Sequence, residues 1–364
     1  MRRPSARLWR TAAILASCLT VSCLDDPVDL GGHDDYLAQL ELIWNQYDRL
    51  FVGFVYTGAV DWDEVFEEYS ARTDTVTTQA SFIYLMSEML SELEDAGICL
   101  VFAGDPIVPW QPDVEASYDW DVLWQNYLEP AGFEWFEEGW WGYCVMDSVP
   151  YILIAEWNDM IYGGYLDEVL AQHPDAPAVV IDQRPCGGGS VERIGQVARR
   201  FNDQTRIAYY TLYRKGPGRE DLSEPEPRHV YTLPSWYEGP VAVLIGEDCY
   251  GAPELFACMA DELPNAVLIG DTTMSEVTTP AVYALPGGSS YSVPVETILR
   301  ADSSSWLQVT GVAPDIFVPA TPEDFAAGRD PILEFALLWA RGAGPGARAS
   351  WTSGPARTRH SREW

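Results

Sequence analysis

The chain has 364 residues, of which 47% are hydrophobic, so it can bury a substantial core in one large domain or two ordinary ones. Its formal net charge at pH 7 is −33. The stretch from residue 24 to residue 341 holds 14 basic and 54 acidic residues. Because phosphates and anionic lipid headgroups attract positive charge, this balance argues against nucleic acid as a partner and against direct adhesion to a membrane.

Residues 1–23 have the pattern of an export signal. A basic start is followed by the apolar run Thr11–Val21, which is too short to span a bilayer. The small residues before Cys23 resemble a bacterial lipoprotein lipobox, so we expect a lipoprotein signal peptide, lipidation of Cys23 and a polar tether over residues 24–34. Cys18 is the competing position, and an ordinary secretory signal is the plainer alternative. The expected location is the bacterial cell envelope, with membrane contact through the lipid anchor only.

Seven cysteines are present, but none lies in a CxxC motif or in a cysteine–histidine cluster with zinc-ligand spacing. We therefore expect no metal site and no cofactor. Five cysteines remain beyond the signal segment, and because this number is odd at least one thiol stays unpaired. These five are Cys99, Cys144, Cys186, Cys249 and Cys258.

The region from residue 35 to residue 97 is expected to form a small helical domain. Hydrophobic residues recur at spacings of three and four between Tyr36 and Leu50, which gives a helix one apolar face. Asp61 is a candidate N-cap for a second helix, and Thr77 or Thr78 for a third.

The next region begins with a strand over Ile98–Phe102. Residues 103–140 are rich in proline and tryptophan. Their rings could line a groove for a ligand, but the plainer interpretation is that they cover the edge of the core. A hairpin is expected over Gly142–Met146 and Tyr151–Glu156, turning at residues 147–148.

Two units of helix followed by strand come next. A helix over Gly164–Gln172 leads to a buried strand over Ala178–Ile181, then to the glycine-rich segment 185–190 and a helix over Val191–Phe201. Glycines between a strand and a helix can present backbone N–H groups to an oxygen atom. The segment matches neither the G-x-G-x-x-G fingerprint nor a phosphate-binding G-K-[ST] loop. Residues 214–229 are expected to form an exposed loop.

A strand-turn-helix-strand unit follows. It is expected to place strands over Val241–Ile245 and Ala266–Ile269, a turn at residues 248–251 and a helix over Pro253–Leu263. Such a turn commonly carries a nucleophile, because free N–H groups and the positive end of the helix dipole lie there. The last residue of this turn is a glycine, which has no side chain.

The end of the folded region contains further strands and one helix. We expect strands over Tyr291–Val295 and Trp306–Val309. Asp330 and Pro331 are typical of the start of a helix, which we expect over Ile332–Arg341. The remaining tail has a basic, Gly- and Ser-rich composition that is typical of disorder.

Five segments resemble, in order, the tail-specific or C-terminal-processing serine proteases, a family that includes the core of tricorn protease. VVIDQRPCGGGSVERI resembles the D-x-R-x-N-x-G-G loop of that family, and VLIGEDCYGAPELF resembles its nucleophile turn. The other segments are VDWDEVFEEY with LSELEDAG, NAVLIGDTTMSE, and GVAPDIFVPATPEDFAAGRDPILEFAL.

The resemblance covers about residues 36–341 and implies an α/β fold, the Clp-protease/crotonase-like spiral of strand-strand-helix units, after a small N-terminal helical domain. It is closer to a subgroup without a PDZ domain, because the interval between Phe102 and Gly142 is too short to hold one. The expected division is 1–23 signal peptide, 24–34 tether, 35–97 helical domain, 98–341 protease-like core and 342–364 basic tail.

The resemblance also implies where catalytic residues would lie. The family's serine nucleophile lies three residues before the glutamate of the nucleophile turn, which is Glu254 here, so its position is Gly251. Where one branch of the family has a lysine base, this chain has Glu276, and where the other has a histidine it has Gly97. Both the nucleophile and the base are therefore expected to be lost.

Part of the scaffold of such a site is retained. Asp182 and Arg184 remain in the cleft motif, and the N–H groups of Gly188, Gly189 and Ala252 would form the oxyanion hole.

Two groups are candidates for replacing the lost chemistry. Cys249 lies near the start of a helix, where a thiol can be activated, but a nucleophile also needs a base within reach. Ser275 beside Glu276 is a second pair, whose plainer interpretation is a solvated turn.

The sequence therefore predicts a lipid-anchored pseudopeptidase. It would bind an extended peptide or a protein C-terminus by strand addition without cleaving it. Two alternatives stay open: an active serine-type peptidase with relocated catalytic residues, and a structural envelope lipoprotein.

Overall fold

The structure is a computed structural model. The expected signal peptide with Cys18 and Cys23, the tether 24–34 and the basic tail after Gly342 lie outside the residues that it describes. No helix of the described part is long and apolar enough to cross a membrane. The described residues are 35–57, 60–136, 139–157, 163–277 and 279–342.

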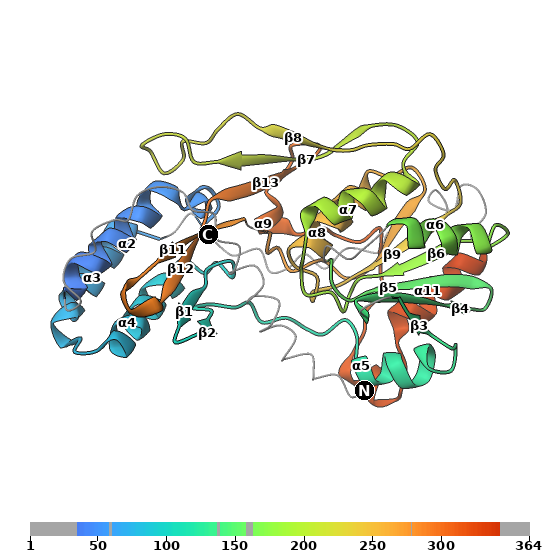
Figure 1. Cartoon of the computed structure of the whole chain (residues 1–364), viewed down its shortest axis with the longest axis horizontal. Helices are drawn as coiled ribbons and strands as arrows, with labels where there is room; N and C mark the ends of the chain where they lie inside the picture. Colours follow the sequence, from blue (N-terminus) through green and yellow to red (C-terminus); the bar gives the residue numbers. More distant parts are fainter. Residues whose placement is uncertain (1–34, 58–59, 137–138, 158–162, 278, 343–364) are drawn as a thin grey trace.

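A seven-stranded sheet forms the centre of the larger part of the molecule (Figure 1). Its order is β14-β10-β9-β6-β5-β4-β3, and the strands from β14 to β5 are parallel to one another. Nearly continuous apolar runs make these strands, as expected for a parallel sheet that is buried on both faces. The bounds are β3 Glu134–Trp135, β4 Trp141–Met146, β5 Val149–Ile154, β6 Val179–Asp182, β9 Val241–Ile245, β10 Ala266–Gly270 and β14 Ile316–Phe317.

Helices cover both faces of this sheet. Side chains alternate along each strand, so Val243 of β9 packs into one hydrophobic cluster and Leu244 into another on the opposite face. The Val243 cluster is shared with three helices that follow strands, and the Leu244 cluster is shared with the last helix of the described chain. These helices are α6 Gly163–Gln172, α7 Val191–Ala198 with η5 Arg199–Phe201, α8 Ala252–Asp261 and α11 Pro331–Gly342.

The N-terminal helices begin as the sequence predicts. The Asp61 carboxylate accepts hydrogen bonds from two N–H groups of the following helix, and Thr78 forms a capping box with Ser81. The bounds are α2 Tyr36–Leu50, η1 Val52–Val55, α3 Trp62–Arg72, η2 Thr73–Thr75 and α4 Gln79–Ser91.

Strands from two distant parts of the chain complete the core of these helices. Leu285, Tyr291 and Val293 belong to the same hydrophobic cluster as the helices. The Tyr47 hydroxyl donates to the Ser292 carbonyl at 2.5 Å, which ties α2 to the sheet. The sheet has the order β11-β12-β1-β2, with β1 Leu100–Phe102, β2 Asp105–Ile107, β11 Pro280–Ala284 (followed by η6 Pro286–Gly288) and β12 Ser290–Pro294.

A third sheet, β13-β7-β8, spans the top of the molecule in Figure 1, between the N-terminal helices and the main sheet. Its strands are β7 Arg206–Tyr213, β8 Glu226–Val230 and β13 Glu296–Arg300. The expected exposed loop is therefore partly wrong, because its last residues pair with β7 as β8. Arg219, in the connection between β7 and β8, reaches the Asp48 carboxylate at 2.7 Å.

Two further local predictions have opposite outcomes. Asp147 and Ser148 both have positive φ, 52° and 68°, and join β4 to β5 as the expected two-residue hairpin turn. The strand expected over Trp306–Val309 is wrong, because the N–H groups of Val309 and Thr310 bond back to the Trp306 carbonyl and form the short helix α9, Leu307–Thr310. A run of four residues is too short for its periodicity to separate a strand from a helix.

The tryptophan-rich region covers the core. Trp120, Trp124 and Trp135 stack on one another and pack against the cluster on the α11 side of the main sheet. Two short helical turns carry part of this region, α5 Trp120–Val122 and the π-helical turn η3 Leu123–Leu128.

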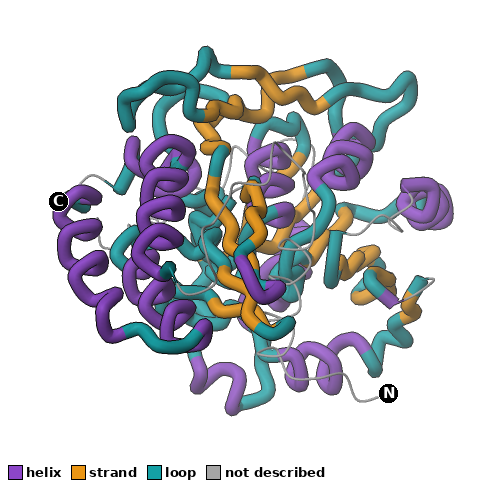
Figure 2. Tube along the Cα trace, turned by 60° about the vertical axis from the view of Figure 1, so that its left-hand side comes forward, coloured by secondary structure: helices purple, strands orange, loops and turns teal. Residues whose placement is uncertain are grey.

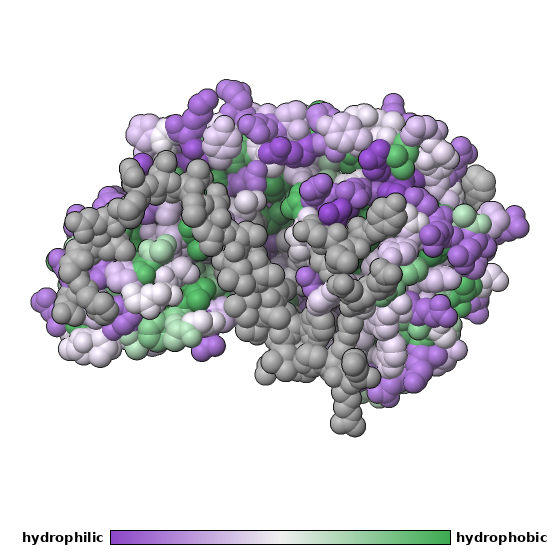
Figure 3. Space-filling model, in the orientation of Figure 1, coloured by the Kyte–Doolittle hydropathy of each residue, from purple (hydrophilic) through white to green (hydrophobic). Residues whose placement is uncertain are grey.

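Figure 2 shows strands running through the middle of the molecule between helices, and further strands along its upper edge. In Figure 3, hydrophilic residues cover most of the visible face, and hydrophobic ones lie in a recess between the N-terminal helices and the main sheet, below the β7–β8 hairpin.

Candidate functional site

The candidate site lies at the carboxyl edge of the main sheet. The segments that follow β6, β9 and β10 contain Gly188, Gly251 and Glu276, and the carboxyl ends of parallel neighbours meet at one edge. The Gly251 N–H donates to the Glu276 carbonyl at 2.7 Å. A Cβ atom added at Gly251 would lie 3.9 Å from the Gly188 Cα. The fold therefore brings these three positions together.

Gly251 has a backbone conformation that L-residues rarely adopt. It caps α8 with φ 67° and ψ −124°, at the sharp turn between β9 and the helix. The Gly188 Cα is the one heavy atom of the described chain within 4 Å of an added Cβ, its chain neighbours aside. The position has the strained geometry of a nucleophile turn and open space where a side chain would start.

Glu254 holds this turn against the segment after β10. Its side chain is fully buried. One carboxylate oxygen accepts from the Thr273 hydroxyl at 2.5 Å and the Ser275 N–H at 2.8 Å, and the other accepts from the Glu276 N–H at 2.9 Å. Glu254 therefore acts as an anchor between two loops and is withdrawn from solvent.

The glycine-rich segment is fixed by the backbone that leaves β5. Gly188 and Gly189 have φ of 121° and 125°, and the Gly188 carbonyl accepts from the Trp157 N–H at 3.1 Å. A Cβ on Gly189 would overlap the Trp157 carbonyl oxygen, whereas Gly188 has open space. Within the described residues the Ala252 N–H donates no hydrogen bond, so it is available to an oxygen atom of a ligand. The Gly188 backbone contacts the buried Cys186 thiol: burial raises the pKa of this thiol, and the hydrogen bond from Gly188 opposes that rise.

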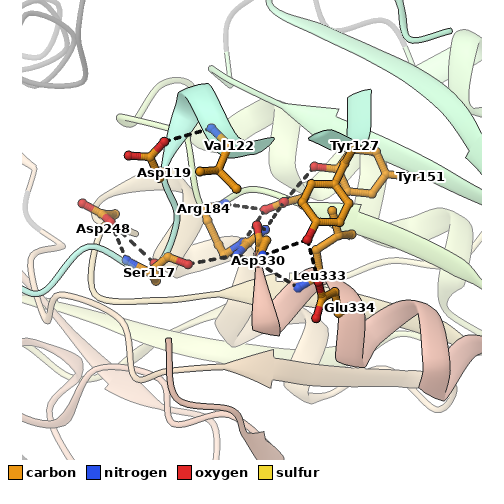
Figure 4. A network of polar contacts seen from close by, with 11 residues as sticks. Ser117, Asp119, Val122, Tyr127, Tyr151, Arg184, Asp248, Asp330, Leu333 and Glu334 are labelled. Atoms are coloured by element: carbon orange, nitrogen blue, oxygen red, sulfur yellow. Dashed lines mark hydrogen bonds and ion pairs between the residues drawn. The ribbon is translucent and has the colours of Figure 1, made fainter. Parts of the chain in front are cut away.

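Asp182 and Arg184 do not face a cleft. Both are fully buried, and the Arg184 guanidinium bonds to Asp182 and Asp330 with four contacts between 2.7 and 3.0 Å (Figure 4). The Tyr151 hydroxyl donates to Asp182 at 2.7 Å. Burial raises the pKa of Tyr151 well above its usual value. Their expected place in the cleft is therefore wrong, since their contacts are internal and join β6 to the start of α11 and to the Ser117 carbonyl.

Asp330 was expected only to begin a helix. It does so, because its carboxylate accepts from the Leu333 N–H at 3.0 Å, but the same carboxylate also pairs with Arg184. The sequence signal for this second role was the D-x-R motif at the end of β6 and the D-P motif at the start of α11. Their spacing in the sequence does not show that the two motifs meet in space.

The thiol of Cys249 lacks the surroundings of a nucleophile. It is fully buried, its sulfur contacts the Gln183 carbonyl at 3.7 Å, and burial raises its pKa well above the usual value. Reactive thiols have lowered pKa values and partial exposure, so the structure argues against Cys249 as a replacement nucleophile.

Gly97 and Ser275 complete the expected positions. Gly97 lies in the loop before β1, where its N–H donates to Asp95 at 2.9 Å and its carbonyl accepts from the Ser292 hydroxyl at 3.2 Å. Within the described residues no hydrogen bond joins it to the turn at Gly251. Ser275 has φ 68° and a buried hydroxyl without a partner in the described chain, so its side chain is not solvated.

Comparison with known proteins identifies the family. Residues 148–318 match the model of peptidase family S41, and residues 33–91 match that of the tricorn protease C1 domain. A carboxyl-terminal-processing protease from Picosynechococcus sp. is 27% identical over 158 residues, which are 43% of this chain and 35% of that protein. The chain therefore aligns with about a third of the length of this relative.

Two solved structures resemble the fold over most of the chain. A candidate peptidase from Parabacteroides merdae is 25% identical with a TM-score of 0.75, covering 84% of this chain and 98% of its own. A lipoprotein from Streptococcus agalactiae is 12% identical with a TM-score of 0.56, covering 88% of this chain and 99% of its own. The chain thus has the Clp-protease/crotonase-like α/β fold and belongs to the tail-specific protease family, peptidase family S41.

Proposed function

We propose that this protein is a pseudopeptidase of the S41 family, which binds an extended peptide or a protein C-terminus without cleaving it. The observation that carries the proposal is Gly251. It occupies the start of α8 in a strained conformation with open space beside it, but it supplies no reactive atom.

The chemistry of peptide cleavage supports this interpretation. Acyl transfer by a serine-type peptidase needs a nucleophile and a base that accepts its proton. The positions that the family resemblance implies for these groups hold Gly251, Glu276 and Gly97. The nearby Cys249 thiol is buried and its pKa is raised, so it offers no substitute.

The retained groups suit binding. The N–H group of Ala252 is available to a carbonyl or carboxylate oxygen, and Glu254 keeps the loops around it in place. Backbone donors of this kind can hold an extended peptide by main-chain hydrogen bonds.

A fluorophosphonate probe and peptide binding test the proposal together. Residues 24–364 would be incubated with the probe and, separately, with fluorescein-labelled 12-residue peptides that carry free or amidated C-termini. We expect no covalent labelling, no cleavage, and an increase in anisotropy for some peptides. Labelling or cleavage that a point change abolishes would refute the pseudopeptidase, and the absence of any peptide binding would refute the binding function.

Gly251→Ser is the matched variant. Its hydroxyl would start beside Gly188, so we expect it to gain slow labelling by the probe while peptide binding persists. Ser275→Ala is the control, since its hydroxyl is buried and should not be the labelled group.

We also propose that the protein is exported and lipid-anchored through Cys23 in the bacterial cell envelope. The lipobox-like segment before Cys23 supports this, and one structural relative carries the name lipoprotein. Expression in a bacterial host with radiolabelled palmitate should label the protein and place it in the membrane fraction. Cys23→Ser should abolish both, and Cys18→Ser should change neither. If instead Cys18→Ser abolishes labelling and membrane association and Cys23→Ser does not, the lipidated residue is Cys18.

A further inference from the structure

A small pocket opens next to the candidate site, at the carboxyl ends of β10 and β14. Its volume is about 220 Å³. Small-molecule sites usually span about 300–1,000 Å³, so this pocket suits one side chain better than a whole ligand. It is lined by Glu115, Ala116, Ser117, Asp271, Phe317, Val318, Pro319, Ala320, Thr321, Pro322, Glu323 and Ile332.

The lining combines apolar surface with negative charge. Phe317, Val318 and Ile332 are apolar, whereas Glu115, Asp271 and Glu323 carry carboxylates. None of the described residues that line the pocket is basic. An amphipathic cation, with an apolar stem and a charged end, complements such a lining.

Hydrogen bonds build the walls of the pocket in advance. The Val318 N–H donates to the Gly270 carbonyl at 2.9 Å, which fixes the segment after β14 to the end of β10. The Thr321 side chain caps α10, Pro322–Ala326, and forms a capping box with Asp324. A lining that is already ordered loses little entropy on binding.

Another part of the lining, residues 115–117, is bonded to the loop of the candidate site. The Glu115 N–H donates to the Glu247 carboxylate at 2.7 Å, and the Ser117 N–H donates to Asp248 at 3.1 Å. The Ser117 carbonyl accepts from the buried Arg184 at 2.9 Å (Figure 4). Glu247 and Asp248 lie in the same loop as Gly251, so hydrogen bonds tie one wall of the pocket to the loop that holds the vacated nucleophile position.

We propose that this pocket takes the arginine or lysine side chain of a peptide bound across the carboxyl edge of the sheet. The inference rests on the proposed peptide-binding function and makes its ligands basic peptides. It also fits the acidic body of the protein, which attracts cationic chains at long range.

The test uses fluorescein-labelled 12-residue peptides of one sequence that carry arginine, lysine or citrulline at one position. Citrulline keeps the shape of arginine without its charge. We expect the arginine and lysine peptides to bind residues 24–364 about five- to tenfold more tightly than the citrulline peptide. The variant Glu115→Gln/Glu323→Gln changes two exposed rim carboxylates and should remove most of this difference, and Asp271→Asn should reduce it further.

Glu41→Gln/Glu67→Gln is the control, because it removes two exposed carboxylates of α2 and α3 and changes the net charge equally. Its preference for cationic peptides should stay as in the parent protein. Equal binding of arginine and citrulline peptides would overturn the pocket while leaving the peptide-binding function intact. If the control variant loses as much of the preference for cationic peptides as the pocket variant does, the preference comes from net charge, and the proposed pocket is also overturned. If none of the three peptides binds, and this holds when the varied residue is moved to each other position of the peptide, the peptide-binding function itself would be overturned.

Discussion

At the scale of single residues, the glycines of the candidate site are required for different reasons. Gly251 has open space around its missing side chain, but its φ and ψ are costly for any other residue. Gly189 has a positive φ and in addition lies against the Trp157 backbone. A glycine kept for conformation tolerates a larger residue at a moderate cost, whereas one kept for space does not.

Alanine at two neighbouring glycines separates these effects. Gly188 and Gly189 have nearly equal φ, 121° and 125°, but an added Cβ meets the Trp157 carbonyl only at Gly189. We expect Gly188→Ala to lower the free energy of unfolding by about 1–3 kcal/mol. Gly189→Ala should lose about 1–3 kcal/mol more, because the backbone must move to relieve the overlap. Urea unfolding of both variants gives the comparison, and equal losses would contradict the assigned contact.

At the scale of elements, one buried ion network joins β6 to α11. The Arg184 guanidinium lies between Asp182 and Asp330, and all three side chains are at most 1% exposed. Isolated charges at such depth are very costly, so each member depends on the others. The carboxyl edge of the sheet, which carries the candidate site, is therefore stabilised by a contact between residues that are far apart in the sequence.

Arg184→Met tests this dependence. It leaves two buried carboxylates facing each other without their partner, and we expect a loss of about 3–5 kcal/mol in unfolding free energy. Arg341→Met is the matched control, since Arg341 pairs with Asp147 at the surface, where a pair contributes about 0–1 kcal/mol. Urea midpoints measure both. A loss for Arg184→Met as small as that of the control would show that the network is dispensable.

The elements also show what the sequence could and could not predict. The buried strands around Val243 and Leu268 and the N-caps at Asp61 and Thr78 depend on local patterns, and they were predicted within a residue or two. The strands β7, β8, β11 and β13 have mixed polarity without a clear period, so none of the four was predicted from the sequence. The convergence of Gly188, Gly251 and Glu276 followed from the resemblance, whereas the internal role of Asp182 and Arg184 depended on a distant partner.

At the scale of the whole molecule, buried thiols make stability depend on pH. Burial raises the pKa of Cys144, Cys186 and Cys258 to about 12 each, against about 8.5 in an unfolded chain. Between these values the unfolded chain has lost thiol protons that the folded protein retains. The unfolded state therefore binds fewer protons, and stability falls as pH rises.

We expect the urea midpoint to be steady between pH 7 and 8 and to fall from pH 8.5 to pH 10.5. Each fully protected thiol contributes a slope of up to about 1.4 kcal/mol per pH unit. Cys186→Ala should make the slope smaller, whatever its effect on the absolute stability, and the buried tyrosines should leave a residual slope. An unchanged slope in this variant would contradict the assignment to the Cys186 thiol.

The N-terminal helices share their hydrophobic core with strands from much later in the chain. Their hydrophobic cluster includes Leu285, Tyr291 and Val293, which lie about two hundred residues later in the sequence. Without these strands the helices would expose apolar surface to water. Such exposure costs about 25 cal/mol per Å², and the total cost would be a large fraction of the stability of a small domain.

We therefore expect residues 35–97 expressed alone to be largely unfolded in far-UV circular dichroism, with no cooperative thermal transition. The helices should form when residues 280–295 are supplied through a designed linker, because these residues carry β11 and β12 and restore the missing side of the core. The same fusion with Tyr291→Ser and Val293→Ser should stay unfolded, since the strand would be present without its apolar side chains. A cooperative transition in the isolated helices would show instead that this region folds independently of the returning strands.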